Sequence, residues 1–258
     1  MTQSQTLFGH ALRRWRTSRR LSQLELATRA STPPRHVSFL ETGRSRPSRD
    51  MVLRLADALD LPLSERNGLL HTAGFPPHFP ERALSDAALA PIRLVIDRVL
   101  RSHAPFPGLL LDRWYDILDA NLGARRLLFG GQPIDPDDPP NLVELLLGPM
   151  RDQLLNWEHH VHDALLRLRK DVLDAPDDER LRDLLARVED HASDAPLSSD
   201  PAPVLTSRVR VDGLELETLS TLVRFGGARD VTIDGLHLEL IFPADAQTEA
   251  FLRALGQP

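Results

Sequence analysis

The N-terminal fold follows from the stretch Ser22-Gln-Leu-Glu-Leu-Ala-Thr-Arg-Ala-Ser-Thr-Pro-Pro-Arg-His-Val-Ser-Phe-Leu-Glu-Thr-Gly-Arg-Ser-Arg-Pro-Ser-Arg49. Ser22 and Glu25 have the spacing of a capping box, which begins a helix. Pro33-Pro34 suits the first turn of a second helix, because a missing N–H costs nothing there, and Gly43 suits its end. Two short helices joined by a tight turn predict a helix-turn-helix that binds DNA. The alternative is a helical hairpin that only packs.

Apolar residues at helical spacing extend this motif to an all-α bundle of five helices. A first helix is expected over residues 6–19 and a fifth ends near Gly74. The residues predicted to face the core are Leu7, Ala11 and Trp15, then Leu21, Leu24 and Ala27, then Val37 and Leu40, then Val52, Leu55, Ala56 and Leu59.

Three spaced motifs resemble the Cro/phage-repressor (XRE) helix-turn-helix family over roughly residues 7–73. They are Ser22-Gln23 with Leu26-Ala27, then Val37-Ser38-x-Leu40-Glu41-x-Gly43-Arg44-x-x-Pro47-Ser48, and Leu55-Ala56-x-Ala58-Leu59. The resemblance implies that Arg16 pairs with Glu41 and that Gln23 grips phosphate. It also implies that the side chains at Pro34, Arg35, Ser38 and Phe39 face the DNA groove. Pro33-Pro34 departs from the family, so Pro34 can offer only apolar contact, for instance to a thymine methyl.

The predicted DNA contacts divide into base readers and phosphate binders. Arg35 can bond a guanine through two acceptors, or else hold only a phosphate. His36 and Ser38 are secondary readers and Phe39 is an apolar one, whereas Ser22, Gln23, Arg44 and Arg46 are placed for phosphate. Because one such domain makes few base contacts, we expect a homodimer on a double-stranded palindromic operator.

The charge distribution agrees with a DNA-binding module on a body that does not bind DNA. Residues 1–75 hold twelve arginines and six acids, a net charge of +6, and the remainder carries −12. A basic first quarter on an acidic remainder is typical of this arrangement.

Length and composition bound the class of protein. A chain of 258 residues is long enough for two domains. With no cysteines it has no disulfide and no thiolate ligand. No apolar run approaches the roughly 20 residues of a membrane span, and Met1-Thr-Gln-Ser-Gln-Thr6 is unlike a signal peptide. These features predict a cytoplasmic protein that does not enter membranes.

The second half is predicted to be a separate α+β domain. We place the first domain at residues 1–75, a proline-rich linker at 76–88 and the second domain at 89–258. Helices are expected over 91–102, from Asn121 to Phe129, and over 141–147, 157–170, 178–190 and 246–255. A hairpin turns at Asp112-Arg113, polar loops cover 130–140 and 193–203, and three β-rich runs cover 204–211, 214–225 and 231–242. About five antiparallel strands with helices on one side follow.

This half resembles the ligand-binding domain of MmyB-like transcription regulators over roughly residues 90–255. The motifs are Leu111-Asp-Arg-Trp-Tyr-Asp-Ile-Leu-Asp-Ala-Asn121, Asn156-Trp157, Phe225-Gly226 with Asp230-Val231, and Leu240-Ile-Phe-Pro-Ala-Asp245. The resemblance implies a PAS-like fold with a long apolar pocket suited to a fatty-acid-like ligand. The short segment between Arg187 and Val204 and the proline-rich loops in the middle depart from the family.

A pocket for an acyl chain needs apolar lining and one or two polar groups for the head. Trp157, Trp114, Leu110 and Phe225 are lining candidates, and Arg113 or an inward-facing histidine could meet the head group. Each could equally be an ordinary core residue.

Other chemistries find less support in the sequence. His159, His160 and His162, with Asp163, could ligate a metal but are more typical of a solvated helix face, so we predict no metal site. Nucleotide-binding, nucleophile-elbow and HExxH motifs are absent, and no enzyme is expected. The prediction is a transcription regulator that senses a small apolar ligand and has no cofactor, unless a fatty acid or similar ligand stays bound. Alternatively, the C-terminal domain serves only dimerisation or protein binding, or the chain is an antitoxin-like DNA binder.

Overall fold

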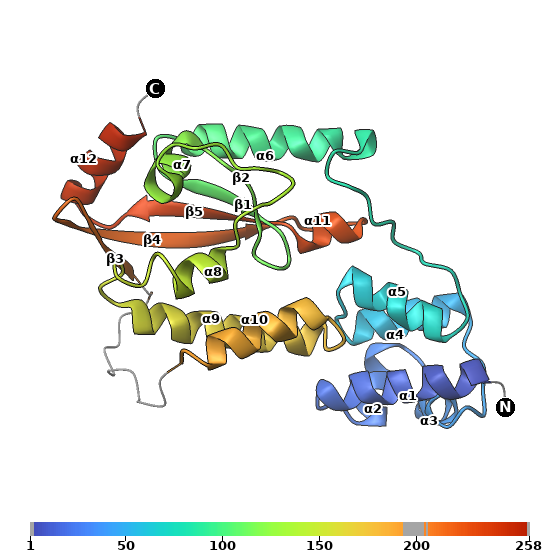
Figure 1. The fold of residues 1–258 in the computed structure, drawn as a ribbon. Coiled ribbons are helices and arrows are strands. Elements are labelled where there is room, and N and C mark those ends of the chain that lie inside the picture. Colours follow the sequence, from blue (N-terminus) through green and yellow to red (C-terminus); the bar gives the residue numbers. More distant parts are fainter. Residues whose placement is uncertain (1–2, 193–203, 205, 257–258) are drawn as a thin grey trace. The chain divides into compact units, whose positions relative to one another are not determined.

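The structure is a computed structural model that describes residues 3–192, 204 and 206–256 (Figure 1). The chain forms two compact units. The first is built on the N-terminal residues up to Arg82 and the second on most of the remainder.

The first unit is the five-helix bundle that the sequence predicts. Its helices are α1 (Gln3–Ser18), α2 (Gln23–Arg29), α3 (Pro34–Glu41), α4 (Arg49–Ala58) and α5 (Leu63–Thr72). Val37, Leu40, Val52, Leu55, Ala56 and Leu59 are buried as predicted. They pack with Phe8, Leu12, Trp15, Leu26 and Leu70 into one apolar core.

Two helix faces differ from the prediction. The side chains of Leu7 and Leu24 are 53% and 62% exposed. In α1 the buried stripe is Phe8, Leu12 and Trp15, and in α2 the buried residues are Leu26 and Ala27. A spacing of four fits either of two neighbouring stripes on a helix, so the pattern leaves a rotation of one residue open.

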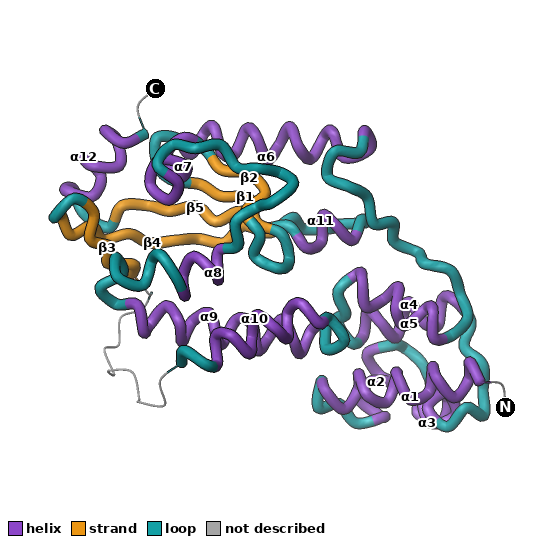
Figure 2. The backbone as a smooth tube through the Cα atoms, viewed as in Figure 1, coloured by secondary structure: helices purple, strands orange, loops and turns teal. Residues whose placement is uncertain are grey.

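The second unit alternates helices with short strands (Figure 2). A 3-10 turn (Ala87–Leu89) leads into α6 (Ala90–His103), followed by β1 (Gly108–Leu111), β2 (Ile117–Ala120), α7 (Leu122–Phe129) and α8 (Leu142–Leu147). Then come α9 (Trp157–Asp174), α10 (Glu179–Glu189), β3 (Thr206–Val211), β4 (Leu214–Arg224), β5 (His237–Pro243) and α12 (Ala246–Leu255). The short helix α11 (Val231–Gly235) lies between β4 and β5 in the chain, but its residues up to Asp234 belong to the first unit.

The five strands form one antiparallel sheet in the order β2-β1-β5-β4-β3. The first and last strands of the domain therefore meet at the centre, where Leu109 pairs with Glu239. Asp212-Gly213 joins β3 to β4 with positive φ at both residues, as the Asp-Gly signal predicts.

Helices cover both faces of the sheet rather than one. In Figure 1, α6 runs along one face, and α8, α9 and α10 lie on the other. The apolar residues of β1 give the reason. Adjacent residues of a strand point to opposite faces of the sheet, and the neighbours Leu109 and Leu110 are both only 1% exposed. A strand buried on both sides needs two covering layers.

The predicted strand over residues 231–242 is also corrected. Its first part is the short helix α11, and only His237–Pro243 forms a strand. The Asp230 carboxylate accepts a hydrogen bond from the Thr232 amide at 3.0 Å, as a helix cap does. The β-branched residues Val231 and Ile233 favoured a strand, but the cap before them begins a helix. The predicted loop at 193–203 lies outside the described residues.

Among the helices that the structure describes, none is both long enough and apolar enough to span a membrane.

Candidate functional site: a helix-turn-helix surface and a ligand-sized cavity

The capping box at the start of α2 forms as predicted. The Glu25 amide donates to Ser22 Oγ at 3.1 Å, and the Ser22 amide donates to Glu25 Oε2 at 2.7 Å. The turn that follows uses a left-handed backbone at Ser31, where φ is 49°. α3 then begins directly with Pro34. Local sequence thus fixes where both helices of the motif begin.

A single buried carboxylate joins the three helices around this turn. Glu41 accepts hydrogen bonds from Arg16 Nε at 2.6 Å and from Gln23 Nε2 at 2.8 Å. The hydrogen bond to Glu41 raises the pKa of Arg16, against the opposing effect of burial. The Arg16–Glu41 pair is therefore present as the family resemblance implies. One of the two N–H groups of the Gln23 side-chain amide is donated to Glu41, so the other N–H and the remaining polar groups of Gln23 are the ones available for phosphate.

The outer face of α3 carries the predicted base readers. Pro34 and Arg35 are exposed and His36, Ser38 and Phe39 are half-buried, whereas Val37 and Leu40 point into the core. The guanidinium groups of Arg35 and Arg44 lie 5.0 and 5.9 Å from the centre of the Phe39 ring. Cation–π contact at this distance orients both cations on one surface. Ser22 and Arg46 are exposed.

The second unit contains a cavity of about 360 Å³, within the size range of small-molecule sites. One wall is a single face of the sheet, because alternate strand residues share a face. The sheet residues that line it are Leu109, Ser207, Val209, Leu216, Thr218, Ser220, Glu239 and Ile241.

The opposite wall is largely apolar and comes from the helices and their connections. It is lined by Leu127 and Leu128 of α7, Leu142, Val143 and Leu146 of α8, Met150 and Leu154 of the following segment, Ala164 and Leu168 of α9, and Leu252 of α12. Such a lining favours an apolar ligand, because each contact removes ligand surface from water.

Five polar residues, His160, Asp163, Arg167, Ser220 and Glu239, form what we call the charged cluster of the cavity lining. Arg167 Nε pairs with Asp163 Oδ2 at 2.7 Å, one turn apart on α9. Burial raises the pKa of the Glu239 carboxyl, opposed by its hydrogen bond with Ser220 and by the charge of Arg167. Burial lowers the pKa of His160, which has a hydrogen bond to the backbone of Thr206. His160 Nε2 is buried without a hydrogen-bond partner.

Tyr115 adds a second polar feature to the lining. Its hydroxyl donates to Asp171 Oδ2 at 2.6 Å, and its ring meets that of His237 edge-on at 5.7 Å. Burial, followed by the charge of Asp171, raises the pKa of Tyr115. Burial and nearby Arg224 lower the pKa of His237 to about 4, which keeps this imidazole neutral at pH 7.

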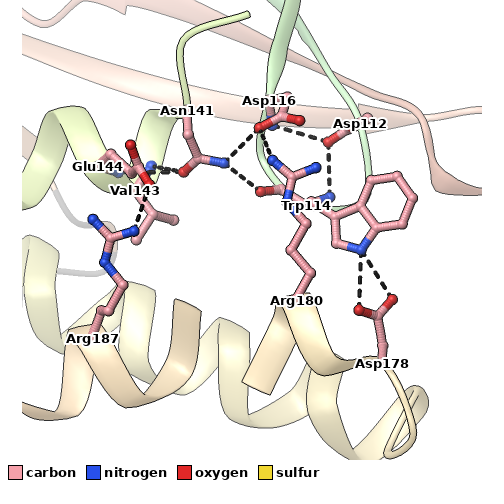
Figure 3. Close-up of polar contacts among 9 residues, drawn as sticks. All are labelled: Asp112, Trp114, Asp116, Asn141, Val143, Glu144, Asp178, Arg180 and Arg187. Carbon is pink, nitrogen blue, oxygen red and sulfur yellow. Dashed lines mark hydrogen bonds and ion pairs between the residues drawn. The ribbon is translucent and has the colours of Figure 1, made fainter. Parts of the chain in front are cut away.

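The turn between β1 and β2 holds α8 and α10 in place (Figure 3). Asp116 accepts hydrogen bonds from Asn141 Nδ2 at 2.8 Å and from Arg180 Nη2 at 2.6 Å. The Asn141 side-chain oxygen caps α8, and Asp178 caps α10 while accepting from Trp114 Nε1 at 3.0 Å. These contacts give Trp114 and Asp116 of the 111–121 motif a structural role: they anchor helices.

The structure does not bring the predicted ligand residues to the cavity. Leu110 lies on the other face of the sheet from Leu109, and Phe225 follows the end of β4. Arg113 and Trp114 both bond Asp178. Trp157 Nε1 donates to the Leu146 carbonyl at 2.7 Å. Within the described residues, none of these five lines the cavity, so we assign its lining to the residues named above.

The residues that sequence reasoning missed had weak signals. Glu239 stands inside the apolar run Leu238-Glu-Leu-Ile241, where a charge in a strand marks a special position. Asp163 and Arg167 have the i, i+4 spacing of a helix pair. Of the three clustered histidines, His160 lines the cavity, whereas His162 is exposed. The described residues contain no group of three or more His, Asp or Glu side chains arranged to hold a metal ion.

Comparisons with known proteins agree with this division. A helix-turn-helix domain model matches residues 7–69, and the model of the MmyB-like transcription regulator ligand binding domain matches residues 92–255. No curated protein matches the chain. The solved structure of an RNA-binding light-oxygen-voltage receptor aligns with 97% of this chain and 62% of its own length, at 14% identity and a TM-score of 0.29. The chain thus spans less than two thirds of that receptor, and so weak a likeness says nothing about fold or function.

The chain thus combines a helix-turn-helix domain with a C-terminal domain of the MmyB-like transcription regulator ligand binding family. Because the second family model covers more than half of its length, the chain belongs to the MmyB-like transcription regulators.

Proposed function

We propose that the protein binds a specific DNA operator and that a small, fatty-acid-like ligand in the C-terminal domain controls this binding. The observation that supports sensing is the cavity of about 360 Å³, which has a mainly apolar lining and one charged cluster. A ligand can alter DNA binding only if its affinity differs between two arrangements of the protein. The ligand therefore has to favour one of them.

On the DNA side, the outer face of α3 carries the proposal. Arg35 reads a base, Pro34 and Phe39 make apolar contacts, and His36 and Ser38 are secondary readers. Ser22, Gln23, Arg44 and Arg46 bind phosphate. The shared stacking of Arg35 and Arg44 on Phe39 supports this, because it holds two cations on one surface.

Several further properties belong to the same proposal. We infer domains at residues 1–75 and 89–258 joined by a linker at 76–88. A PAS-like fold for the second domain is supported by its single five-stranded antiparallel sheet, one face of which closes a ligand-sized cavity. Two copies on a palindrome fit the small number of base contacts that one motif makes, so we propose a homodimer. The protein acts in the cytoplasm, without catalysis.

The alternative is a C-terminal domain that only dimerises or binds a protein partner. That role needs no ligand and is compatible with a fully packed interior. Protein interiors are normally close-packed, with few voids larger than a water molecule. A cavity of this size therefore favours sensing.

Two measurements test the proposal. Native mass spectrometry of the purified protein, followed by organic extraction, should show a dimer with a near-stoichiometric small apolar ligand. Selection from random duplexes should give a palindromic sequence whose affinity changes when that ligand is added. A dimer that carries no ligand and takes up no single-chain amphiphile would reject sensing. Failure to select any sequence would reject specific DNA binding.

A further inference from the structure

The charged cluster limits which head group the cavity can accept. Its members come from two sides of the cavity, the helix α9 on one and the sheet strands β4 and β5 on the other. His160, Asp163 and Arg167 lie on one face of α9, at a spacing of three to four residues. Ser220 and Glu239 share the cavity face of the sheet. The cluster thus spans the space between helix and sheet.

The hydrogen bonds already made within the protein show which polar atoms of the cavity lining remain available to a ligand. Ser220 bonds the Glu239 carboxyl, and the Tyr115 hydroxyl is committed to Asp171. One nitrogen of His160 bonds the Thr206 backbone, so a neutral ring presents Nε2 as an acceptor, and this atom has no partner. A buried polar atom without a partner costs free energy, which a ligand bearing a donor would recover.

The charges of the cavity lining also favour a head group that donates hydrogen bonds. Among the described residues of the lining, two carboxyl groups, Asp163 and Glu239, accompany a single guanidinium, that of Arg167. Arg167 is already paired with Asp163. A ligand carboxylate would bring a third acid to one cation, whereas an ammonium or hydroxyl head adds no negative charge.

We propose that the cavity takes an alkyl chain whose head group donates hydrogen bonds, a primary amine or an alcohol, to Glu239 and His160, in preference to a carboxylate. This rests on the proposed function, namely that the cavity binds a single-chain amphiphile, and specifies its head group: the ligand resembles a fatty acid in its chain but not in its carboxylate.

The test compares three probes that share one chain length: decylamine, decanol and decanoate. Each is titrated calorimetrically into the delipidated full-length protein at pH 7, below the concentration at which it forms micelles. We expect the better of the two donor probes to bind at least about tenfold more tightly than decanoate, the factor that one hydrogen bond to a charged group supplies. Whether decylamine or decanol binds more tightly shows whether the preferred donor is an ammonium or a hydroxyl group.

Variants then locate the effect. Glu239→Gln keeps a partner for Ser220 but removes the charge, so decylamine should lose about tenfold in affinity while decanol changes little. The matched control is Glu215→Gln, because Glu215 lies on β4 but is exposed. The order of the three probes on the unmodified protein needs no variant, so a poorly folded Glu239→Gln protein leaves the test intact.

Each outcome decides something different. Binding of decanoate as tight as, or tighter than, both donor probes overturns the head-group inference but leaves the proposed sensor standing. Failure of all three probes to bind overturns the chain-like ligand itself, and with it this inference. A Glu239→Gln protein that is well folded and keeps full affinity for decylamine removes Glu239 from the head-group site.

Discussion

Arg16 and Glu41 lie 25 positions apart and form a doubly bonded ion pair, with Nε–Oε1 at 2.6 Å and Nη2–Oε2 at 3.0 Å. Gln23 donates to the same carboxylate. Because the Glu41 side chain is only 3% exposed, water cannot replace these partners. One glutamate of α3 thus joins this helix to both α1 and α2.

Glu41→Ala should destabilise the first unit by about 3 kcal/mol, because it leaves the Arg16 guanidinium largely buried without its counter-charge. Hydrogen exchange followed by mass spectrometry measures this locally, on peptides from α1, α2 and α3. Glu41→Gln, which keeps hydrogen bonding, should have a smaller effect. Unchanged protection in the alanine variant would show that the pair contributes no stability.

Arg35→Ala should lower the preference for the selected operator over a scrambled duplex by roughly tenfold to a hundredfold, the range expected for losing one bidentate base contact. Salt-sensitive binding to the scrambled duplex should largely remain. Titrations at several salt concentrations separate the two effects. Arg13, which is exposed on α1, provides the control in Arg13→Ala. If selectivity is unchanged, Arg35 holds only phosphate.

Ala164→Phe should abolish ligand binding, because position 164 lines the cavity and the larger side chain occupies its space. Binding of the ligand-free protein to DNA should persist, since the change lies outside the first unit. Calorimetry and an operator titration provide the two readouts. Ala186→Phe, on the exposed surface of α10, is the matched control. Retained ligand affinity in Ala164→Phe would place the ligand elsewhere.

Asp112 should make stability depend on pH. Burial, together with the nearby charge of Asp116, raises the pKa of Asp112 from 3.8 to about 6, although backbone hydrogen bonds from Asp116 and Trp114 and the charge of Arg180 oppose this. The folded state thus holds a proton that the unfolded state releases between about pH 4 and pH 6. Stability is greatest below this window and falls, by about 1–3 kcal/mol, as the pH rises through it.

Asp112→Asn should remove that loss, because an amide oxygen can accept the same two backbone hydrogen bonds without a charge. Urea unfolding of the second unit at about pH 4 and about pH 7 measures it. The variant should be more stable than the native protein at the higher pH by about 1–2 kcal/mol. Asp119→Asn is the exposed control. A native protein that gains stability through this window would contradict the assignment to Asp112.

The features that the sequence predicts well are local. The Ser22–Glu25 capping box, the Asp212-Gly213 turn and the Asn121 cap each involve neighbours in the chain, so their residue types are sufficient to predict them. The errors at Leu7 and Leu24 arise because the inner face of a helix is not a local property. A helix with apolar residues at adjacent positions has two plausible inner faces, and only the packing partner selects one.

The cavity lining could not be predicted because it depends on which faces meet. Alternation along β1 separates Leu109 from Leu110 but does not say which of them faces α9. Trp114 and Trp157 are predicted from the sequence to line the pocket because large aromatic side chains are typical of pockets. Each indole N–H instead finds an acceptor at a helix end, Asp178 for one and the Leu146 carbonyl for the other.

The cavity between sheet and helices also affects how the family can diversify. A side chain in a close-packed core cannot change size without a cavity or a clash, so positions such as Phe8 and Leu40 resist substitution. Val143, Leu216 and Ile241 line the cavity, so exchanging them removes fewer contacts within the protein. Selection can therefore retune what the domain recognises in small mutational steps, while the rest of the fold keeps its stability.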